Sequence, residues 1–150
     1  MLRSKRSRLL LTFASVLFLL VVAVTPALAA VFQDVTYTYD SSAQTFTIYA
    51  TTGMYGAPIA LNSATLRVDG GAVRTDAACT TGSSGLYPTP YAQCVFSGVN
   101  ATSKIASSAT VVLSPSGWNY STYTGKFAVS CKGVATKGCS GTKSVRLVGR

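Results

Sequence analysis

The stretch DVTYTYDSSAQTFTIYA, residues 34–50, decides the fold class of this chain. Its first half places Val35 and Tyr37 at alternate positions, and after DSSAQ the second half continues the alternation with Phe46 and Ile48. Alternate residues of a β-strand share one face, so a period of two predicts strands rather than helices. The polar run DSSAQ is typical of a turn, and the stretch therefore predicts a β-hairpin.

The rest of the chain continues this pattern. ATLRVDGGAVRTD, residues 64–76, places Leu66 and Val68 before an Asp-Gly-Gly turn, which predicts a second hairpin. No segment beyond residue 30 has helical periodicity, and further strands are expected at residues 92–96, 110–113, 126–131 and 144–148. About seven short strands separated by Gly, Ser and Pro predict a mainly β protein, a single antiparallel sheet or sandwich.

The first 29 residues have the composition of a secretory signal peptide. Four basic residues precede a sixteen-residue apolar run, LLLTFASVLFLLVVAV, and the small-residue segment TPALAA follows it. The run is shorter than the roughly 20 residues that a membrane-spanning helix needs, which favours cleavage over retention as an anchor. We therefore expect residues 1–29 to be removed and residues 30–150 to form one secreted β-rich domain without a membrane span.

The charge of the expected mature domain is smaller than that of the whole chain. Thirteen Lys and Arg against four Asp give +9, and loss of the four cations in residues 1–29 leaves nine against four, or +5. These cations either meet an acidic wall polymer or acidic protein face, or only keep a small protein soluble. Nucleic acid is not expected as a partner, because the chain has no motif for it. Six of the cations lie toward the C-terminus, at Lys126, Lys132, Lys137, Lys143, Arg146 and Arg150.

Four cysteines in an exported domain of this size predict two disulfides. Of the three pairings we favour Cys79 with Cys94 and Cys131 with Cys139, because each closes a short segment rich in turn residues. A zinc site is disfavoured, since the chain has no histidine and the Cys131–Cys139 spacing is wide for a zinc knuckle. We expect no metal and no other cofactor.

The residue types of the chain argue against catalysis. Histidine and glutamate are both absent, which removes Ser-His-Asp and Cys-His mechanisms. A glycosidase would have to use aspartates as its two carboxylates, because the chain has no glutamate. Asp40 and Asp69 lie in predicted turns, where an aspartate commonly caps its own backbone. Ser140 and Lys143 have the order of a serine-lysine dyad but lie in a glycine-rich turn. The protein is therefore not expected to be an enzyme.

The segment GWNYSTY, residues 117–123, brings three aromatic residues together. Aromatic faces stack on sugar rings or anchor a peptide, which makes Trp118, Tyr120 and Tyr123 a candidate binding surface. The even spacing of Trp118 and Tyr120 fits a pair of core aromatics equally well.

Two segments carry a resemblance to a known family. CTTGSSGLYPTPYAQC, residues 79–94, resembles the first disulfide loop of the Streptomyces subtilisin inhibitor family, in which equally spaced cysteines enclose a glycine and a ring-proline pair, here Gly85, Tyr87 and Pro88. VVLSPSGWNYSTYTGKFAVSC, residues 111–131, is similar to the later strand pair of that family, with Gly117, Trp118, Phe127 and Cys131 at matching positions. The resemblance covers residues 64–131 and implies an α+β, subtilisin-inhibitor-like fold as the alternative to an all-β one.

The resemblance implies a secreted inhibitor that binds an extracellular subtilisin-like or trypsin-like serine protease. Such an inhibitor presents a preorganised extended loop as a substrate mimic, so binding loses little ordering entropy. The loop corresponds to residues 103–108, with either Lys104 or Ala106 in the specificity pocket, and the reactive-loop candidates are Lys104, Ile105, Ala106 and Ser107. Family members carry a cysteine beside the reactive bond, and this chain has none there.

A second interpretation is a non-inhibitory secreted binding or structural module on the same scaffold. Its ligand is either a cell-wall glycan at Trp118 and Tyr120 or a protein partner at the loop of residues 79–94. Because a fold does not determine function, a scaffold without a clamped inhibitory loop is free for such use. The sequence leaves a homodimer open.

Overall fold

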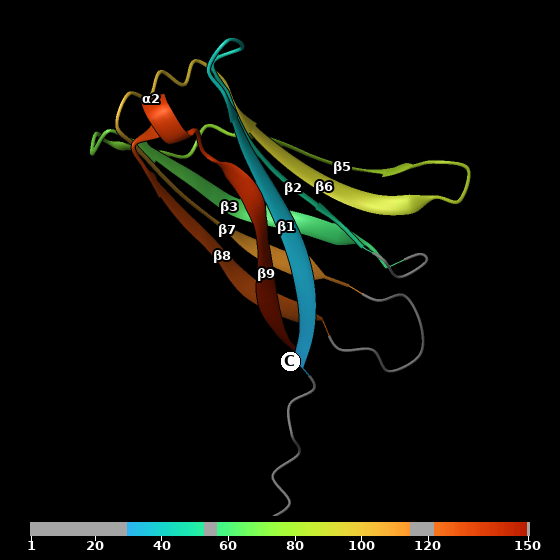
Figure 1. Ribbon diagram of the computed structural model, residues 1–150. Helices are drawn as coiled ribbons and strands as arrows, with labels where there is room; N and C mark the ends of the chain where they lie inside the picture. The colour runs from blue at the N-terminus through green and yellow to red at the C-terminus, as the bar shows by residue number, and fades with distance from the viewer. Residues whose placement is uncertain (1–29, 53–56, 115–121, 150) are drawn as a thin grey trace, which may run out of the picture.

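The computed structural model describes residues 30–52, 57–114 and 122–149 (Figure 1). One antiparallel sheet of nine strands has the order β4-β3-β7-β8-β9-β1-β2-β6-β5. The prediction of a mainly β, single antiparallel sheet is confirmed, and the α+β alternative is wrong, since helix among the described residues is limited to the four-residue α2 (Val134–Lys137). The strands are β1 (Ala30–Asp40), β2 (Thr45–Thr51), β3 (Ile59–Val68), β4 (Val73–Arg74), β5 (Ala78–Ser84), β6 (Thr89–Phe96), β7 (Lys104–Leu113), β8 (Tyr123–Lys132) and β9 (Ser140–Gly149).

The sheet is curled so that its two halves face each other. Strands β4, β3, β7 and β8 form one half, and β9, β1, β2, β6 and β5 form the other. The halves are joined where β8 pairs with β9, at Tyr123 with Gly149 and at Thr124 with Val148. Beyond this short junction the two strands separate, and Figure 1 shows β3 and β7 lying behind β1 and β2.

Alternate residues of the strands fill the space between the two halves. On β7, Ile105 and Val111 are fully buried, whereas Lys104 and Thr110 face outward. The rings of Tyr37 and Phe127 meet across the two halves, with centroids 6.0 Å apart. Apolar and polar residues alternate in the sequence because one face of each strand is buried and the other faces outward. The largest buried side chains come from both halves, namely Phe46, Ile48, Phe96 and Leu147 from one and Leu66, Ile105 and Phe127 from the other.

Both predicted hairpins are confirmed. Strand β1 pairs with β2 up to the last pair, Asp40 with Thr45, and Oδ1 of Asp40 accepts hydrogen bonds from the N–H groups of Ser42 and Ala43 in the turn. Strand β3 pairs with the two-residue β4 around a turn in which Asp69 has φ 48° and the following glycine φ 77°. Asp and Gly are the residues that accept this left-handed backbone most readily.

Both predicted disulfides are confirmed. Cys79 on β5 and Cys94 on β6 are cross-strand partners, and Cys131 of β8 is bonded to Cys139, which precedes β9. Each cross-link restricts the unfolded chain and contributes roughly 2–4 kcal/mol to stability in the chain-entropy model. Two disulfides are consistent with an extracellular protein.

Some predictions fall on residues that the structure does not describe. The expected signal peptide, residues 1–29, lies outside the described residues, as do Trp118 and Tyr120. Within the described part of the chain, no helix is long and apolar enough to cross a membrane.

Candidate binding surface

The reactive-loop candidates lie inside the sheet. Lys104, Ile105, Ala106 and Ser107 begin β7, which pairs with β3 on one side and with β8 on the other. Ile105 is fully buried, and the Ser107 hydroxyl donates a hydrogen bond to the carbonyl of Thr65. The family resemblance implies an extended loop at residues 103–108, whereas from Lys104 onward the structure has a strand between two neighbouring strands. The backbone groups of Lys104–Ser107 therefore take part in the sheet and do not form a protruding loop.

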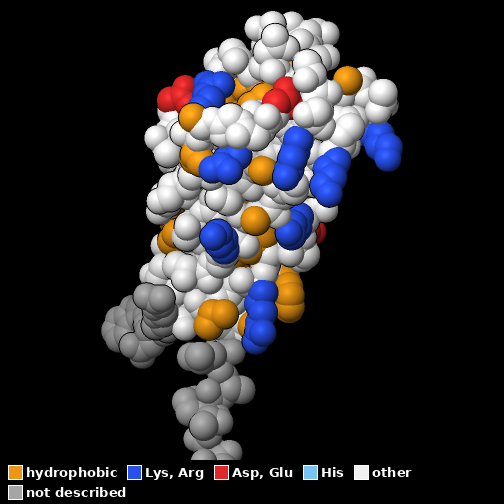
Figure 2. All heavy atoms as spheres, turned by 90° about the vertical axis from the view of Figure 1, so that its left-hand side faces the viewer, with side chains coloured by type: hydrophobic (Ala, Val, Ile, Leu, Met, Phe, Trp, Pro, Cys, Tyr) orange, Lys and Arg blue, Asp and Glu red, His pale blue; other side chains and the backbone are white. Residues whose placement is uncertain are grey.

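Seven exposed cations lie on the strands around β7 and β8 and on α2. Figure 2 shows Lys and Arg side chains spread along this face, with carboxylates near its upper end and at its margin. We call this surface the cationic face, and it consists of Arg67 on β3, Lys104 on β7, Lys126 and Lys132 on β8, Lys137 on α2, and Lys143 and Arg146 on β9.

Two of these cations stand directly opposite each other. Lys104 and Lys132 are register partners of β7 and β8. Like charges at opposite positions of neighbouring strands destabilise a sheet. Among residues 30–52, 57–114 and 122–149 one ion pair is present, Arg74 with Asp76, and none of the seven cations takes part in an ion pair. The positive charge of the cationic face is therefore not neutralised by the described part of the chain.

Asp69 lies beside Lys104 but forms no ion pair with its ammonium group. The carboxylate of Asp69 accepts hydrogen bonds from the N–H groups of Lys104, Thr102 and Ser103 at 2.7–2.8 Å, and from the hydroxyls of Thr102 and Ser103. These bonds, the one from the Lys104 N–H first, hold the pKa of Asp69 well below its usual range. The sequence predicts that Asp69 caps the backbone of its own turn. Its carboxylate instead holds the start of β7, and therefore the position of Lys104.

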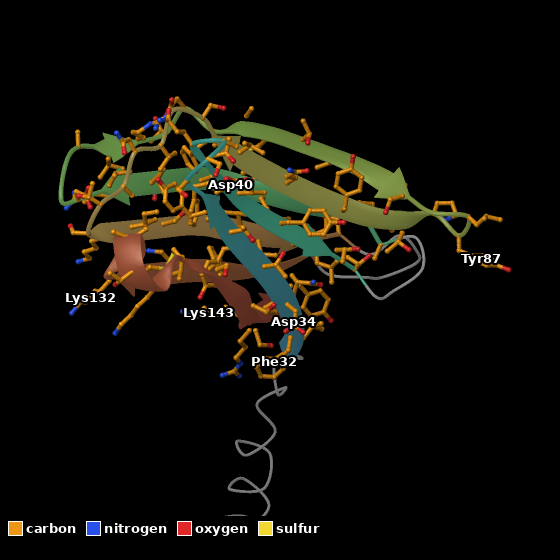
Figure 3. The ribbon with its side chains drawn as sticks, turned by 45° about the horizontal axis from the view of Figure 1, so that its top comes forward. Phe32, Asp34, Asp40, Tyr87, Lys132 and Lys143 are labelled. Atoms are coloured by element: carbon orange, nitrogen blue, oxygen red, sulfur yellow. A yellow bond between two sulfur atoms is a disulfide. The ribbon has the colours of Figure 1, made fainter. Side chains whose placement is uncertain are left out.

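Lys143 connects β8 and β9 at a place where these two strands no longer pair. Its ammonium donates a short hydrogen bond to the carbonyl of Ala128 on β8, although Lys143 belongs to β9. This contact keeps a cation of β9 next to those of β8. Figure 3 shows Lys143 and Lys132 on the same side of the molecule.

A shallow depression lies between the cations of β3 and β7. It has a volume of about 340 Å³, and its lining includes Arg67, Lys104, Val73, Ala106 and Ala128. Two cationic side chains at the margin of an otherwise uncharged depression suit an anionic group such as a phosphate or a carboxylate.

Aromatic and apolar groups are exposed elsewhere. Tyr123, the described member of the predicted aromatic surface, begins β8 and is half-buried. Sequence reasoning did not single out Tyr49 and Tyr91, whose rings stack at 5.8 Å on the outer side of β2 and β6. The turn between β5 and β6 exposes Leu86 completely and Tyr87 to 73%. Figure 3 shows Tyr87 pointing away from the sheet at the far end of this hairpin.

The exposed cationic, aromatic and apolar side chains described above are suited to binding a ligand. The cationic face provides ammonium and guanidinium donors, and the described residues contain no group of three or more His, Cys, Asp or Glu that could hold a metal ion. All seven cations are exposed, so they are accessible to a ligand. In comparisons with known proteins, no family model, no curated protein and no solved structure matches this chain.

Proposed function

We propose that this protein is a secreted, non-catalytic binding protein whose cationic face holds an anionic extracellular polymer, such as a wall polymer rich in phosphate or carboxylate groups. The observation that carries the proposal is the set of seven cations that make no ion pair within the described residues. The direct opposition of Lys104 and Lys132 strengthens it, because a bound polyanion would relieve the repulsion between them.

The length of the cationic face favours a polymer over a small anion. Lys126 and Lys132 lie six positions apart on β8, a distance of about 20 Å at roughly 3.3 Å per residue. Lys104 continues the line of charge onto β7 beside Lys132. Several repeats of a linear polyanion can therefore contact the face at once, which raises affinity beyond that of a single charged group.

Polymer binding can be measured with the mature protein and fluorescently labelled polyphosphate, poly-glutamate and dextran. We expect both polyanions to bind and the uncharged dextran not to bind. Each contact releases bound counterions, so the logarithm of the binding constant should fall linearly with the logarithm of the salt concentration. No binding of either polyanion at low ionic strength would contradict the proposal, as would equal binding of dextran.

A second candidate function is contact with an extracellular protein, a serine protease included, through the turn between β5 and β6. The supporting observation is the complete exposure of Leu86 next to the exposed Tyr87. The Cys79–Cys94 disulfide holds the two strands of this hairpin together. A preorganised apolar turn loses little ordering entropy when it enters a pocket. An inhibitor based on this chain would use this turn rather than Lys104–Ser107, because those four residues are inside the sheet.

The second candidate is tested with a panel of subtilisin-like, trypsin-like and chymotrypsin-like proteases. Inhibition is expected for a protease with an apolar specificity pocket, and Leu86→Asp should abolish it, since an anionic side chain would lose its hydration without gaining a partner. Leu86→Met keeps the apolar side chain and serves as the control. Cleavage of the turn without lasting inhibition would rule out the inhibitor version of this function.

A further inference from the structure

Strand β5 is an edge strand without the usual protection. It is the last strand of the sheet, bonded to β6 on one side, and Figure 1 shows it at the outer margin of the molecule. Its sequence, ACTTGSS, has no charged residue and no proline, and most of its residues are exposed. Proteins commonly block such edges with lysine, proline or a bulge, because an open edge pairs with another chain.

The register of the hairpin shows which backbone groups of β5 are free. Pro90 has no N–H group, and its carbonyl accepts a hydrogen bond from the N–H of Thr52, on the side away from β5. The pair Ser83–Pro90 is therefore a non-hydrogen-bonded pair, and by alternation so are the pairs at Thr81 and Cys79. The short Cα–Cα distance of 4.0 Å between Cys79 and Cys94 agrees with this assignment.

The N–H and C=O groups of Cys79, Thr81 and Ser83 consequently point away from β6. Within the described part of the chain these groups have no hydrogen-bond partner. Three residues at alternate positions thus present a regular row of donors and acceptors that a further strand can continue.

The electrostatics around this edge favour a second copy of the same chain. Residues 77–103 contain no charged residue, although the chain as a whole is strongly basic. Two copies can therefore approach through β5 without the repulsion that their cationic faces would produce. A row of free groups centred on one residue is also self-complementary under a twofold axis.

We propose that β5 pairs antiparallel with β5 of a second copy, with Thr81 opposite Thr81 of the second copy. Cys79 then lies opposite Ser83 of the second copy, and Ser83 opposite its Cys79. Each of the three residues exchanges both backbone groups with the opposite residue, which gives about six interchain hydrogen bonds. A shift of the register by two residues in either direction would leave fewer hydrogen-bonded pairs among Cys79, Thr81 and Ser83. The register centred on Thr81 is therefore preferred. The two sheets become one continuous sheet across the dimer axis.

An engineered cysteine tests both the dimer and its register. All four native cysteines are paired, so Thr81→Cys adds the single free thiol of the chain. Opposite hydrogen-bonded residues have Cα atoms about 5.5 Å apart, within the range of a disulfide. Mild oxidation should therefore convert Thr81→Cys into a covalent dimer.

The matched control is Ser84→Cys, on the same strand and with the same exposure class. In the proposed register it lies opposite Ala78 of the second copy, with its side chain on the other face of the strand from Cys79. The two copies of Ser84 are about 20 Å apart, six residues along the strand direction, so they cannot form a disulfide. Cross-linking of Thr81→Cys no faster than that of Ser84→Cys would overturn the proposal.

Sedimentation of variants without added cysteine gives an independent measurement. Thr81→Pro removes an N–H that points outward, so the pairing of β5 with β6 is retained, whereas Thr81→Val keeps that N–H and loses the hydroxyl. We expect the dissociation constant of the dimer to rise at least about tenfold in Thr81→Pro and to stay near the native value in Thr81→Val. Circular dichroism and the unfolding midpoint of the monomer test whether Thr81→Pro is folded. A native chain that stays monomeric at its highest soluble concentration, or a folded Thr81→Pro that dimerises as well as the native chain, would overturn the proposal.

Discussion

Valine at position 125 is expected to destabilise the folded protein by about 3 kcal/mol, the upper end of the cost of overpacking. Gly125 lies on β8 next to the short junction with β9. A Cβ atom there would lie 2.4 Å from the carbonyl oxygen of Arg146 and 2.6 Å from Cδ2 of Leu147. Real Cβ atoms do not approach a backbone oxygen so closely, so one strand has to move.

The movement is costly because β9 is held from its other side. Strand β9 pairs with β1 over nearly its whole length, including Val31 with Leu147 and Phe32 with Arg146. Glycine inside a strand commonly marks a place where two backbones approach closely, and here the approach lets the sheet fold over between its two halves. Displacing β9 would also move the fully buried Leu147.

The control for Gly125→Val is Ala128→Val, which places the same side chain on the exposed outer side of the same strand. The control should change the free energy of unfolding by less than about 0.5 kcal/mol. Denaturant unfolding with an unchanged m-value measures both variants. A Gly125→Val protein that unfolds within 1 kcal/mol of the native one, roughly the average cost of a point mutation, would show that the junction is not a close packing contact.

The sequence predicted those strands in which large apolar residues alternate with polar ones. The hairpin of residues 34–50 has this pattern, and it folds as β1 and β2. The beginning of β7 does not have it, because its inward residues after Ile105 are the small Ser107 and Ala109. Ser107 is buried through a hydrogen bond to the carbonyl of Thr65, a contact between distant segments that no local pattern shows.

Strand β5 was not predicted from the sequence, for a different reason. Nearly all of its residues are exposed, so neither face has an apolar repeat. Its position depends on the ladder with β6 and on the Cys79–Cys94 disulfide rather than on burial. The sequence predicted the disulfide, but not that the segment between the cysteines is an exposed two-stranded hairpin.

The cationic face could be predicted only in part. The cations toward the C-terminus form a visible group in the sequence, and the described ones all lie on the face. Arg67 and Lys104 lie far earlier in the chain, and they join the face because the strand order places β3 and β7 beside β8. The opposition of Lys104 and Lys132 depends on the register of β7 and β8, which composition does not encode.

Replacing Lys104 and Lys132 together by glutamine is expected to weaken polyanion binding about 30-fold at low ionic strength. A basic side chain near a polyanionic surface contributes about 1 kcal/mol, so the loss of two contributes about 2 kcal/mol, and 1.4 kcal/mol corresponds to a factor of ten. The slope of the salt dependence should fall by about 2, since two fewer counterions are released on binding. The unfolding midpoint should stay the same or rise slightly, because the substitutions remove two like charges at opposite positions of the sheet.

A control variant separates the cationic face from net charge. Thr47→Asp with Gln93→Glu lowers the net charge by the same two units, on the outer side of β2 and β6. Because exposed charges separated by more than about 10 Å are largely screened at 0.1 M salt, this control should lose far less affinity in that buffer. Binding of polyphosphate by the two variants, measured at several salt concentrations, gives both the affinity and the slope. An equal loss of affinity in both variants would show that the polymer responds to the total charge of the protein, and that Lys104 and Lys132 do not form its binding site.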